Sequence, residues 1–366
     1  MYIKLGKLQQ QQGQLKEAIF NFQKAIAIDP SQPYWVYLKL GNTLSQQMKF
    51  DEAVTAYYKA IQMQPNPSAQ MYKDLGNALN QQGKISEAKA IYEQGKIQEA
   101  TNNLNQFLSF LKRYPCHNRD VIDVDIFDNG CEPTGMQLSL LAEQTTGRVV
   151  GTNVAEGFPE HTVQYKTSNA EFYRMDGQAL TFPDNSFGVV MSFNVLEHVP
   201  NPVKYLKECC RVLRPGGYGY FSWKPIWSSA NGHHMSPGYV MSKAEEFEIK
   251  PFPNYRIDGK TIPFWSHLLL TPDEMLSLLV NEKKYAPTLA EWMVDFIYKE
   301  KFINRYFWQD FLSTFQNESW VLLEIIEDKQ YIPRGILSQL RQKYQKYNNA
   351  NDFQIKGATI IVYKEH

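Results

Sequence analysis

A spacing of 35 residues recurs through the N-terminal part of the chain. Leu-Gly pairs stand at Leu5-Gly6, Leu40-Gly41 and Leu75-Gly76. At the same spacing come alanines, aromatic residues and a closing proline: Ala18, Ala53, Ala88, Phe22, Tyr57, Tyr92, Pro30 and Pro65. Because small residues let two helices approach closely, the repeat predicts a helical hairpin, with the aromatic ring filling the space between neighbouring hairpins. Such hairpins stack into an all-α solenoid.

The order Leu-Gly, Ala, aromatic, Ala, Pro resembles the tetratricopeptide repeat. Met1 begins partway into a first helix, so the array starts uncapped or the chain is a fragment of a longer one. GKISEA at 83–88 returns as GKIQEA at 95–100, which predicts one long helix to about Lys112 that caps the array. The resemblance implies a concave surface for a peptide or protein partner. A scaffold that dimerises or fixes a second domain is the alternative.

From about Asp120 the pattern changes to short apolar runs that alternate with helical segments. This pattern predicts a parallel sheet with crossover helices. We expect strands at 121–127, 148–153, 171–175, 188–193 and 217–223, helices at 136–144 and 201–213, and later strands at 320–326 and 353–364. In open sheets of this kind, ligands bind beyond the carboxyl ends of the strands.

Residues 176–217 read DGQALTFPDNSFGVVMSFNVLEHVPNPVKYLKECCRVLRPGG. This run closely resembles class I S-adenosylmethionine-dependent methyltransferases, and the likeness extends over roughly residues 120–223. The resemblance implies an enzyme of α/β class with a Rossmann-like, seven-stranded methyltransferase sheet, preceded by the all-α solenoid. The expected domains are a repeat domain at 1–113 and a methyltransferase domain at 114–366, with a helical or lid insertion around 236–347.

The resemblance also implies positions for S-adenosylmethionine. They are Asp128, Gly130, Cys131, Gly135, Asn153, Asp176, Gly177 and Asn194. In the family, the acidic residue matched by Asp176 accepts a hydrogen bond from the adenine amino group, and the residue matched by Asn194 lies beside the methionine part. Asn153 replaces the acidic residue that usually holds the ribose hydroxyls, so it binds without charge assistance.

The first cofactor loop, IFDNGCEPTG at 126–135, departs from the family's acidic-x-Gly-x-Gly-x-Gly pattern. Glu132 stands in place of the second glycine, and Gly135 comes one position late. The Glu132 side chain has several possible effects: it blocks close backbone approach, repels the cofactor carboxylate, points outward, or meets the cofactor's ammonium or sulfonium charge. We expect cofactor binding to be retained, because the rest of the signature is present.

Four histidines are candidate bases for methyl transfer to a hydroxyl, since histidine accepts protons near neutral pH. His233 and His234 lie in a Gly- and Ser-rich loop after the fifth strand and are the first choice, with His267 and His198 as alternates. The competing interpretation is that these histidines only bind loop backbone. No third ligand at suitable spacing accompanies the His-His pair, so we expect no metal.

The region 271–347 is rich in helix and aromatics, and we expect most of its apolar residues to form a core or a lid. A stripe of Trp292, Phe296, Tyr306, Phe307 and Trp308 lines an acceptor pocket in the alternative interpretation. Residues 271–274 are expected to open a helix with Thr271 as its N-cap.

Lys and Arg together number 38, as do Asp and Glu, so the charge does not favour nucleic acid or an anionic membrane as partner. No apolar run reaches ~18 residues. The four cysteines, Cys116, Cys131, Cys209 and Cys210, suggest neither a disulfide framework nor a zinc cluster. We therefore expect a soluble cytoplasmic protein with reduced thiols.

Three functions remain open. The first is O-methylation of a small-molecule or glycan acceptor, a sugar-containing or other specialised metabolite, as in natural product biosynthesis. The second is methylation of a peptide or carrier-bound substrate that the repeats present. The third is a non-catalytic interaction protein with a degenerate cofactor site.

Overall fold

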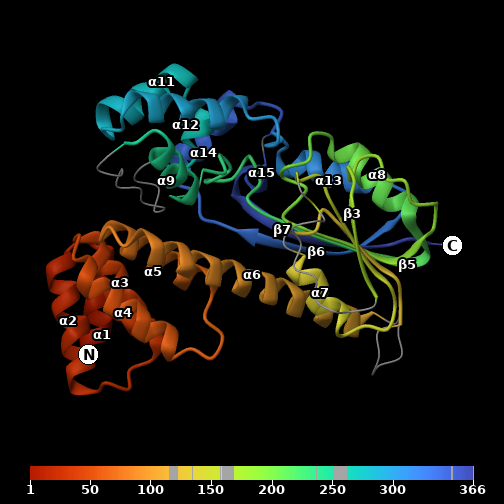
Figure 1. Ribbon diagram of the computed structural model, residues 1–366. Helices are drawn as coiled ribbons and strands as arrows, with labels where there is room; N and C mark the ends of the chain where they lie inside the picture. Colours follow the sequence, from red (N-terminus) through yellow and green to blue (C-terminus); the bar gives the residue numbers. More distant parts are fainter. Residues whose placement is uncertain are drawn as a thin grey trace. The chain divides into compact units, whose positions relative to one another are not determined.

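A computed structural model describes residues 1–114, 123–133, 135–156, 158, 169–235, 237–249, 262–347 and 349–365 (Figure 1). The chain forms two compact units, Met1–Asn105 and Gln106–His366. The division falls inside helix α6 (Ile85–Arg113), whereas the boundary between 113 and 114 expected from the sequence lies at the end of that helix. Each unit is described by itself below.

The first unit is a series of helical hairpins, as the repeat predicts. Its helices are α1 (Tyr2–Gln11), α2 (Leu15–Ile28), α3 (Tyr34–Gln46), α4 (Phe50–Gln62), α5 (Ala69–Gln81) and the beginning of α6. Consecutive helices pack on each other. The long last helix expected from the two GKI segments is confirmed, because α6 continues without a break to Arg113.

The repeated glycines and aromatic residues contact each other within one hairpin. A Cβ placed on Gly41 would lie 2.7 Å from the Tyr57 ring, and one on Gly76 would lie 2.6 Å from the Tyr92 ring. Real Cβ atoms do not approach this closely, so only glycine lets the two helices meet. Our expectation that the ring fills the space between neighbouring hairpins was therefore wrong for this contact: each ring lies on the glycine of its own hairpin.

The equivalent leucines of the three repeats differ in burial. Leu40 is 7% exposed and Leu75 is 0% exposed, because a preceding hairpin covers each of them. Leu5 is 43% exposed, since no described hairpin lies before α1. At the other end, the position held by Ile26 and Ile61 in the earlier repeats is Lys96, which is exposed and pairs with Glu93. The first helix therefore exposes a leucine that later repeats bury, whereas α6 carries a charged residue where earlier repeats have isoleucine.

The second unit contains a seven-stranded sheet in the order β3-β2-β1-β4-β5-β7-β6. The strands are β1 (Ile126–Asn129), β2 (Val149–Asn153), β3 (Ala170–Arg174), β4 (Phe187–Phe193), β5 (Leu213–Trp223), β6 (Val321–Lys329) and β7 (Ile355–Tyr363). The first five run parallel, and β7 is antiparallel to both β5 and β6. The Rossmann-like, seven-stranded sheet expected from the resemblance is confirmed.

Most strand positions agree with the sequence expectations, with differences at the ends. Residues 121 and 122 of the first expected strand lie outside the described residues. β5 begins at Leu213, earlier than expected, because Leu213 already pairs with Phe187. Trp320 precedes β6, and Phe353 lies in the short helix α15 (Asn351–Gln354) that leads into β7.

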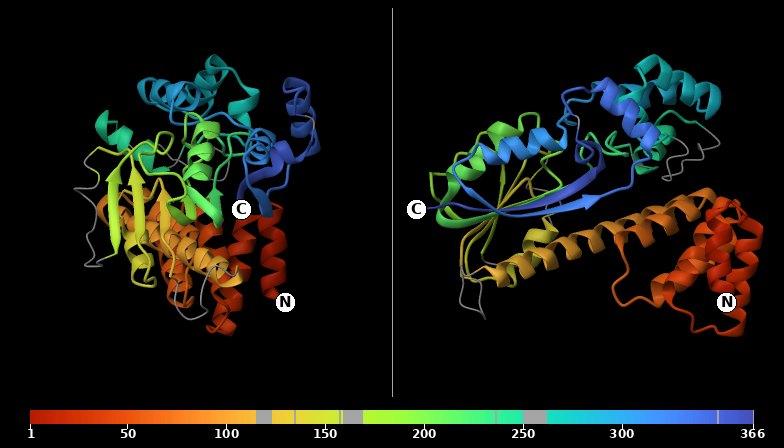
Figure 2. Two further views of the ribbon diagram at one scale, coloured as in Figure 1. Left: turned by 90° about the vertical axis from the view of Figure 1, so that its right-hand side faces the viewer. Right: turned by 180° about the vertical axis from the view of Figure 1, so that it is seen from behind.

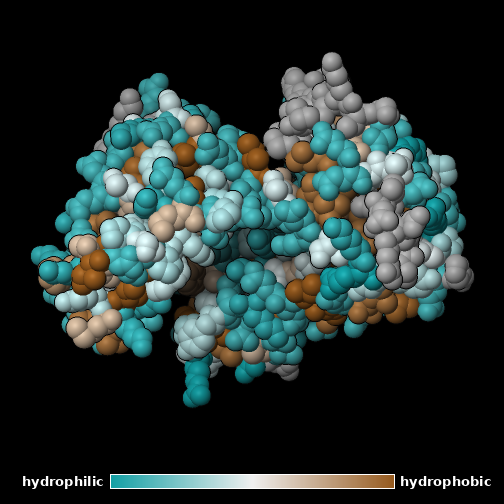
Figure 3. All heavy atoms as spheres, turned by 90° about the horizontal axis from the view of Figure 1, so that it is seen from below, coloured by the Kyte–Doolittle hydropathy of each residue, from teal (hydrophilic) through white to brown (hydrophobic). Residues whose placement is uncertain are grey.

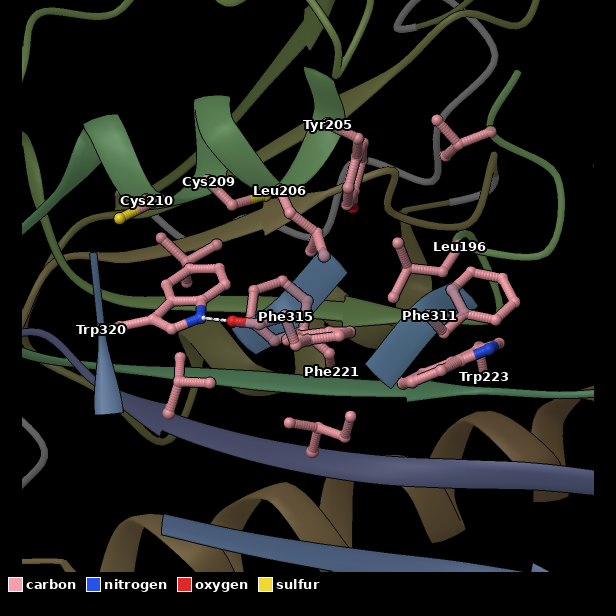
Figure 4. Close-up of a cluster of buried hydrophobic side chains, with 14 of the residues drawn as sticks. Leu196, Tyr205, Leu206, Cys209, Cys210, Phe221, Trp223, Phe311, Phe315 and Trp320 are labelled. Carbon is pink, nitrogen blue, oxygen red and sulfur yellow. Dashed lines mark hydrogen bonds between the residues drawn. The ribbon is translucent and has the colours of Figure 1, made fainter. Parts of the chain in front are cut away.

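Helices cover both faces of the sheet (Figure 2). On one face, α8 (Pro202–Val212) and α13 (Trp308–Gln316) pack over Phe221 and Trp223 of β5, as Figure 4 shows. Side chains alternate along a strand, so Tyr218 and Tyr220 face the other way. There they contact Phe107 and Phe110 of α6, with ring centroids 5.5 Å apart for Phe107 and Tyr220. Helix α7 (Met136–Ala142) lies on that same side, against β2.

Additional helices form a layer with its own apolar core. We call this the helical layer; it consists of α9 (Pro237–Glu246), α10 (Ser266–Leu269), α11 (Pro272–Ser277), the π-helical turn η1 (Leu278–Glu282), α12 (Pro287–Lys299) and α14 (Arg334–Lys343). Thr271 caps α11 in a capping box with Glu274, which confirms the expected N-cap. The aromatic stripe from Trp292 to Trp308 packs into the two cores of this unit rather than forming a surface of its own.

The surface shows no dominant apolar area on the face drawn in Figure 3, where hydrophobic residues are scattered among hydrophilic ones. Among the residues that the structure describes, no helix combines the length and apolar character needed to cross a membrane. The cysteines Cys131, Cys209 and Cys210 are buried free thiols, and Cys116 lies outside the described residues.

The different burial of equivalent leucines gives a paired stability prediction. We expect Leu75→Ala to lower the free energy of unfolding by about 2–5 kcal/mol, because it removes a fully buried side chain and leaves a cavity. We expect Leu5→Ala to cost about 1 kcal/mol or less, since that side chain is partly in water already. Urea unfolding of both variants measures this difference, and equal losses would contradict the exposed first repeat.

Candidate functional site

The candidate site lies where the parallel strands end. Because β1 to β5 run in one direction, their carboxyl ends meet at one edge of the sheet. Of the eight residues expected to bind the cofactor, Asp128 and Asn153 lie at the carboxyl ends of β1 and β2, and the other six lie in the segments that follow β1, β3 and β4. The loop that leaves β5 contains His233 and His234.

The first loop turns through two glycines with left-handed backbone. Gly130 has φ +93° immediately after β1, and Gly135 has φ +69° as the N-cap of α7. The Gly135 N–H donates to the Glu132 carbonyl at 3.0 Å, so Glu132 begins the turn that Gly135 closes. The late glycine therefore directs the chain into α7.

The Glu132 side chain folds back toward α7. Its Oε1 accepts a hydrogen bond from the backbone N–H of Gln137, in the first turn of the helix, at 3.2 Å. The carboxylate thus lies near helix amide groups that have no partner within the helix. The carboxylate is close enough to Asp128 for its charge to raise the pKa of that carboxyl, and whether it permits cofactor binding stays a prediction.

Asp128 is buried, and one of its carboxylate oxygens lacks a hydrogen-bond partner among the described residues. It is 2% exposed, and its Oδ1 has no hydrogen-bond partner among the described residues. Burial raises the pKa of this carboxyl well above its usual range, and the Glu132 charge adds to the effect. A buried carboxylate beside a second acidic group is stabilised by a cation.

Asn153 and Cys131 are mainly used to hold the loops together. Asn153 Nδ2 donates to the Cys131 carbonyl at 2.6 Å, and its Oδ1 accepts from the Ala155 N–H at 2.7 Å. The Cys131 thiol is buried against β2, where a Cβ on Gly151 would meet its sulfur. Asn153 keeps one N–H and one lone pair for a ligand, whereas Cys131 can offer only its backbone.

The other candidates lie around the rim of this edge. Asp176 is exposed, two residues beyond β3, and its Oδ1 accepts from the Gln178 N–H at 2.9 Å. Gly177 lies against Asn129 and Tyr205, where any side chain would clash. Asn194 has φ +53° directly after β4, and its N–H donates to the Ser222 carbonyl.

The loop after β4 is fixed by a residue that sequence reasoning missed. Asn304, between α12 and α13, donates through Nδ2 to the carbonyls of Leu196 and Val199, and its N–H donates to the Glu197 carbonyl. It therefore ties the segment between α12 and α13 to the loop that follows β4. Its sequence context contains no motif, so only the fold reveals this role. Tyr205 of α8 similarly donates to the Asn129 carbonyl at the end of β1.

The four candidate histidines come together in one cluster. The ring centroids of His198 and His234 lie 5.0 Å apart, and those of His233 and His267 lie 5.5 Å apart. Met235 N–H donates to Nδ1 of His233 at 3.0 Å, and Nε2 of His267 lies 2.7 Å from the Trp227 carbonyl. The rings of His233 and His267 thus bind loop backbone, as the competing interpretation expects, and the role of a base stays a prediction.

Burial keeps this cluster neutral. It lowers the pKa of His198, lowers that of His233 well below its usual range, and brings those of His234 and His267 to about 3 and about 4. Repulsion between the histidines adds to the shift for His233 and His234. At neutral pH each ring therefore offers a lone pair rather than a positive charge. In the described part of the chain, no three His, Cys, Asp or Glu side chains are grouped as metal ligands.

Family comparisons match both parts of the chain. Residues 127–221 match the methyltransferase domain family, residues 6–48 match the TPR repeat family, and residues 34–67 match the tetratricopeptide repeat family.

Similar proteins were found in mycobacteria. An uncharacterised methyltransferase of Mycobacterium marinum is 38% identical over 73 residues, which are 20% of this chain and 29% of the relative. One of Mycolicibacterium paratuberculosis is 38% identical over 77 residues, 21% of this chain and 30% of the relative. The chain thus spans only about 30% of the length of these relatives.

Solved structures show a fold-level likeness. The [4+2]-cyclase SpnF has a TM-score of 0.41 and 14% identity, covering 73% of this chain and 82% of its own. A geranyl diphosphate C-methyltransferase from Streptomyces coelicolor, in complex with Mg²⁺, geranyl diphosphate and S-adenosyl-L-homocysteine, has a TM-score of 0.40 and 12% identity, covering 75% and 83%. Scores of this size support no functional inference. On its family matches, the chain joins tetratricopeptide repeats at residues 6–67 to a methyltransferase domain at residues 127–221.

Proposed function

We propose that this chain is an S-adenosylmethionine-dependent methyltransferase, that residues 114–366 form its catalytic domain, and that a hydroxyl oxygen of a small-molecule or glycan acceptor is its target. Asp128 gives the strongest support. A buried carboxylate with an unpartnered oxygen and a raised pKa lies at the carboxyl end of β1, beside a second acidic side chain. A ligand with ammonium and sulfonium charges fits this environment.

The residues around the sheet edge would hold the cofactor as follows. Asp128 faces its positive charges, and the backbone at Gly130, Cys131 and Gly135 lines the first loop. Asn153 contacts the ribose hydroxyls through its remaining N–H and lone pair, and Asp176 binds the adenine amino group from the exposed rim. Gly177 and Asn194 complete the edge. Bound there, S-adenosylmethionine would supply an electrophilic methyl group.

The histidine cluster serves the acceptor. A neutral ring accepts a hydrogen bond from the acceptor hydroxyl, orients its oxygen, and takes the proton as that oxygen loses it. The low pKa of each ring makes it a weak base. A weak base is sufficient, because the hydroxyl proton becomes strongly acidic as the oxygen bonds to the methyl carbon. Because the rings repel each other once charged, the cluster accepts one proton at a time. His198 and His234, which are half-buried, are the better placed to meet an acceptor.

The repeats add an interaction role to this proposal. Helical hairpin arrays present extended concave surfaces, so a protein or peptide partner is the ligand that we assign to residues 1–113. The balanced charge does not favour nucleic acid or membrane lipid as that partner. A cytoplasmic location and a place in specialised metabolism remain part of the proposal.

The first test is cofactor binding by the full chain and by Asp128→Asn. Calorimetric titration should show that the full chain binds S-adenosylmethionine and its demethylated product. The variant should bind S-adenosylmethionine at least about tenfold more weakly, because it loses a charge-assisted contact of about 1.5–3 kcal/mol. Absence of any heat or thermal stabilisation with both ligands, in a folded full chain, rejects the proposed activity.

Glu132→Gln tests whether the substituted loop helps or hinders. Glutamine keeps an acceptor for the Gln137 N–H and removes only the charge. We expect the affinity for S-adenosylmethionine to fall about threefold to tenfold, because a neighbouring charge of this kind is worth roughly 1 kcal/mol. The affinity for S-adenosyl-L-homocysteine, whose sulfur carries no charge, should fall less. Tighter binding of both ligands by the variant would show that Glu132 repels the cofactor.

Neutral buried histidines also predict how stability depends on pH. In the unfolded chain a histidine binds a proton below about pH 6.5, whereas His267 in the folded chain does so only below about 4. Unfolding therefore takes up protons in this window, and the free energy of unfolding falls as pH drops from about 6.5 toward 4. Each such histidine contributes a loss of about 1.4 kcal/mol per pH unit.

His267→Gln isolates this contribution. Glutamine retains a donor for the Trp227 carbonyl but does not titrate. The difference in unfolding free energy between wild type and variant should shrink with falling pH, because only the wild type loses stability through this site. Urea unfolding at several pH values measures it. If the difference in unfolding free energy between wild type and variant stays constant with pH, His267 is not neutral in the folded chain.

A further inference from the structure

Buried polar atoms without partners concentrate beside the histidine cluster. Within the described residues, six such atoms belong to three short segments: Oγ of Ser228, Ser229 and Ser266, Nδ1 of His198, Nε2 of His234 and Nδ1 of His267. Native proteins rarely leave buried polar atoms unsatisfied, so such a concentration calls for water or a ligand.

Hydrogen bonds and ring contacts connect these segments. The Trp265 N–H donates to the Ala230 carbonyl at 3.0 Å, and His267 Nε2 lies 2.7 Å from the Trp227 carbonyl. His198, from the loop after β4, reaches the group through its ring contact with His234. The six atoms thus belong to one region of the fold.

The partners of the histidines decide what they offer. The backbone of Phe302 is hydrogen-bonded to His198, and that of Pro225 to His234. Because these bonds raise each pKa, the rings donate in them, which places the proton on the bonded nitrogen. The unpartnered Nδ1 of His198 and Nε2 of His234 are then lone pairs that can only accept. The same reasoning applies to Nδ1 of His267.

No charged group in the described part of the chain shifts the pKa values of these histidines, although buried Glu197 precedes His198 and the Arg305 guanidinium lies 5.2 Å from the Trp227 ring. Burial, neighbouring histidines and backbone hydrogen bonds shift the pKa values of His233, His234 and His267. No carboxylate or cation among the described residues contributes to these shifts. A ligand charge placed against the rings would therefore meet no opposite charge that acts on them, which disfavours charged ligands.

We infer that the serines at 228, 229 and 266 and the histidines at 198 and 234 form an acceptor subsite for a neutral polyhydroxylated group, such as a sugar ring. This inference rests on the proposed function and narrows its substrate class. Ring nitrogens that only accept require donors, and serine hydroxyls both donate and accept, so several hydroxyls of one ligand match the set. His233 and His267 act as positioning residues, because His233 precedes His234 in the chain and the ring of His267 contacts that of His233.

The test uses the full chain with isotope-labelled histidine and three matched probes: methyl α-D-glucopyranoside, glucuronic acid and glucosamine. The neutral sugar should shift the ring resonances of His198 and His234 with a measurable dissociation constant. The anionic and cationic sugars should bind at least tenfold more weakly. A charged probe that binds as well as the neutral one, or no response to any of the three, overturns the inference.

Two serine variants separate binding from structure. Ser228→Ala and Ser229→Ala remove buried hydroxyls that have no partner, so the free energy of unfolding should stay equal or rise while the affinity for the neutral sugar falls at least threefold. Ser192→Ala is the matched control, because its buried hydroxyl is hydrogen-bonded to Tyr205 at 2.8 Å and its removal should lower stability. If Ser228→Ala and Ser229→Ala lose stability but keep their affinity for the sugar, the two hydroxyls stabilise the fold and the inference is wrong.

Calorimetry with S-adenosyl-L-homocysteine on the same samples keeps the two proposals apart. Product binding with no sugar response rejects the subsite and leaves the methyltransferase intact. Sugar binding without product binding rejects the methyltransferase and leaves a sugar-binding site.

Discussion

The parallel pairing of β1 with β2 and β4 is the constraint on which the site depends. It brings the loops after these strands to one edge, although Asp128 and Asn194 are far apart in sequence. The approach is close enough that a Cβ on Gly130 would lie 2.7 Å from a Val195 methyl carbon. The loop after β1 and the loop after β4 therefore depend on each other, and a change in either would move the other.

Buried polar groups at this edge are costly to the fold, and their partners show how that cost is limited. Tyr205 bridges the Asn129 carbonyl and Ser192, and Asn304 binds three carbonyls of the loop after β4. These side chains satisfy backbone groups that would otherwise be buried alone. Asp128 lacks such a bond at Oδ1 among the described residues, so a buried carboxylate oxygen without a partner lies where we propose that a charged ligand binds. A fold selected for stability alone would place an apolar residue there.

Much of this architecture could be predicted from sequence because it depends on local patterns. The period of 35 predicted the hairpins, the return of GKI at 95–97 predicted the long α6, and apolar runs located the strands to within a few residues at most ends. The histidine candidates were identified by residue type, but their pairing was not predictable, since His198 reaches His234 only through the fold. Asn304 and Ser266 carry no motif, and their roles follow from which loops the helical layer contacts. The aromatic rings of the repeats are a similar case. Their spacing was evident in the sequence, but the glycine that each ring contacts could not be predicted from it.

At Glu132 the first loop departs from the family's glycine pattern, and the backbone conformation of Gly135 accommodates this departure. The glycine that comes one position late adopts the left-handed conformation that starts α7, and the intervening turn runs from Glu132 to Gly135. The carboxylate accepts a hydrogen bond from a backbone N–H at the beginning of α7, where backbone amides carry partial positive charge. Its charge acts on Asp128, and the two acidic side chains at this loop disfavour an anionic ligand there.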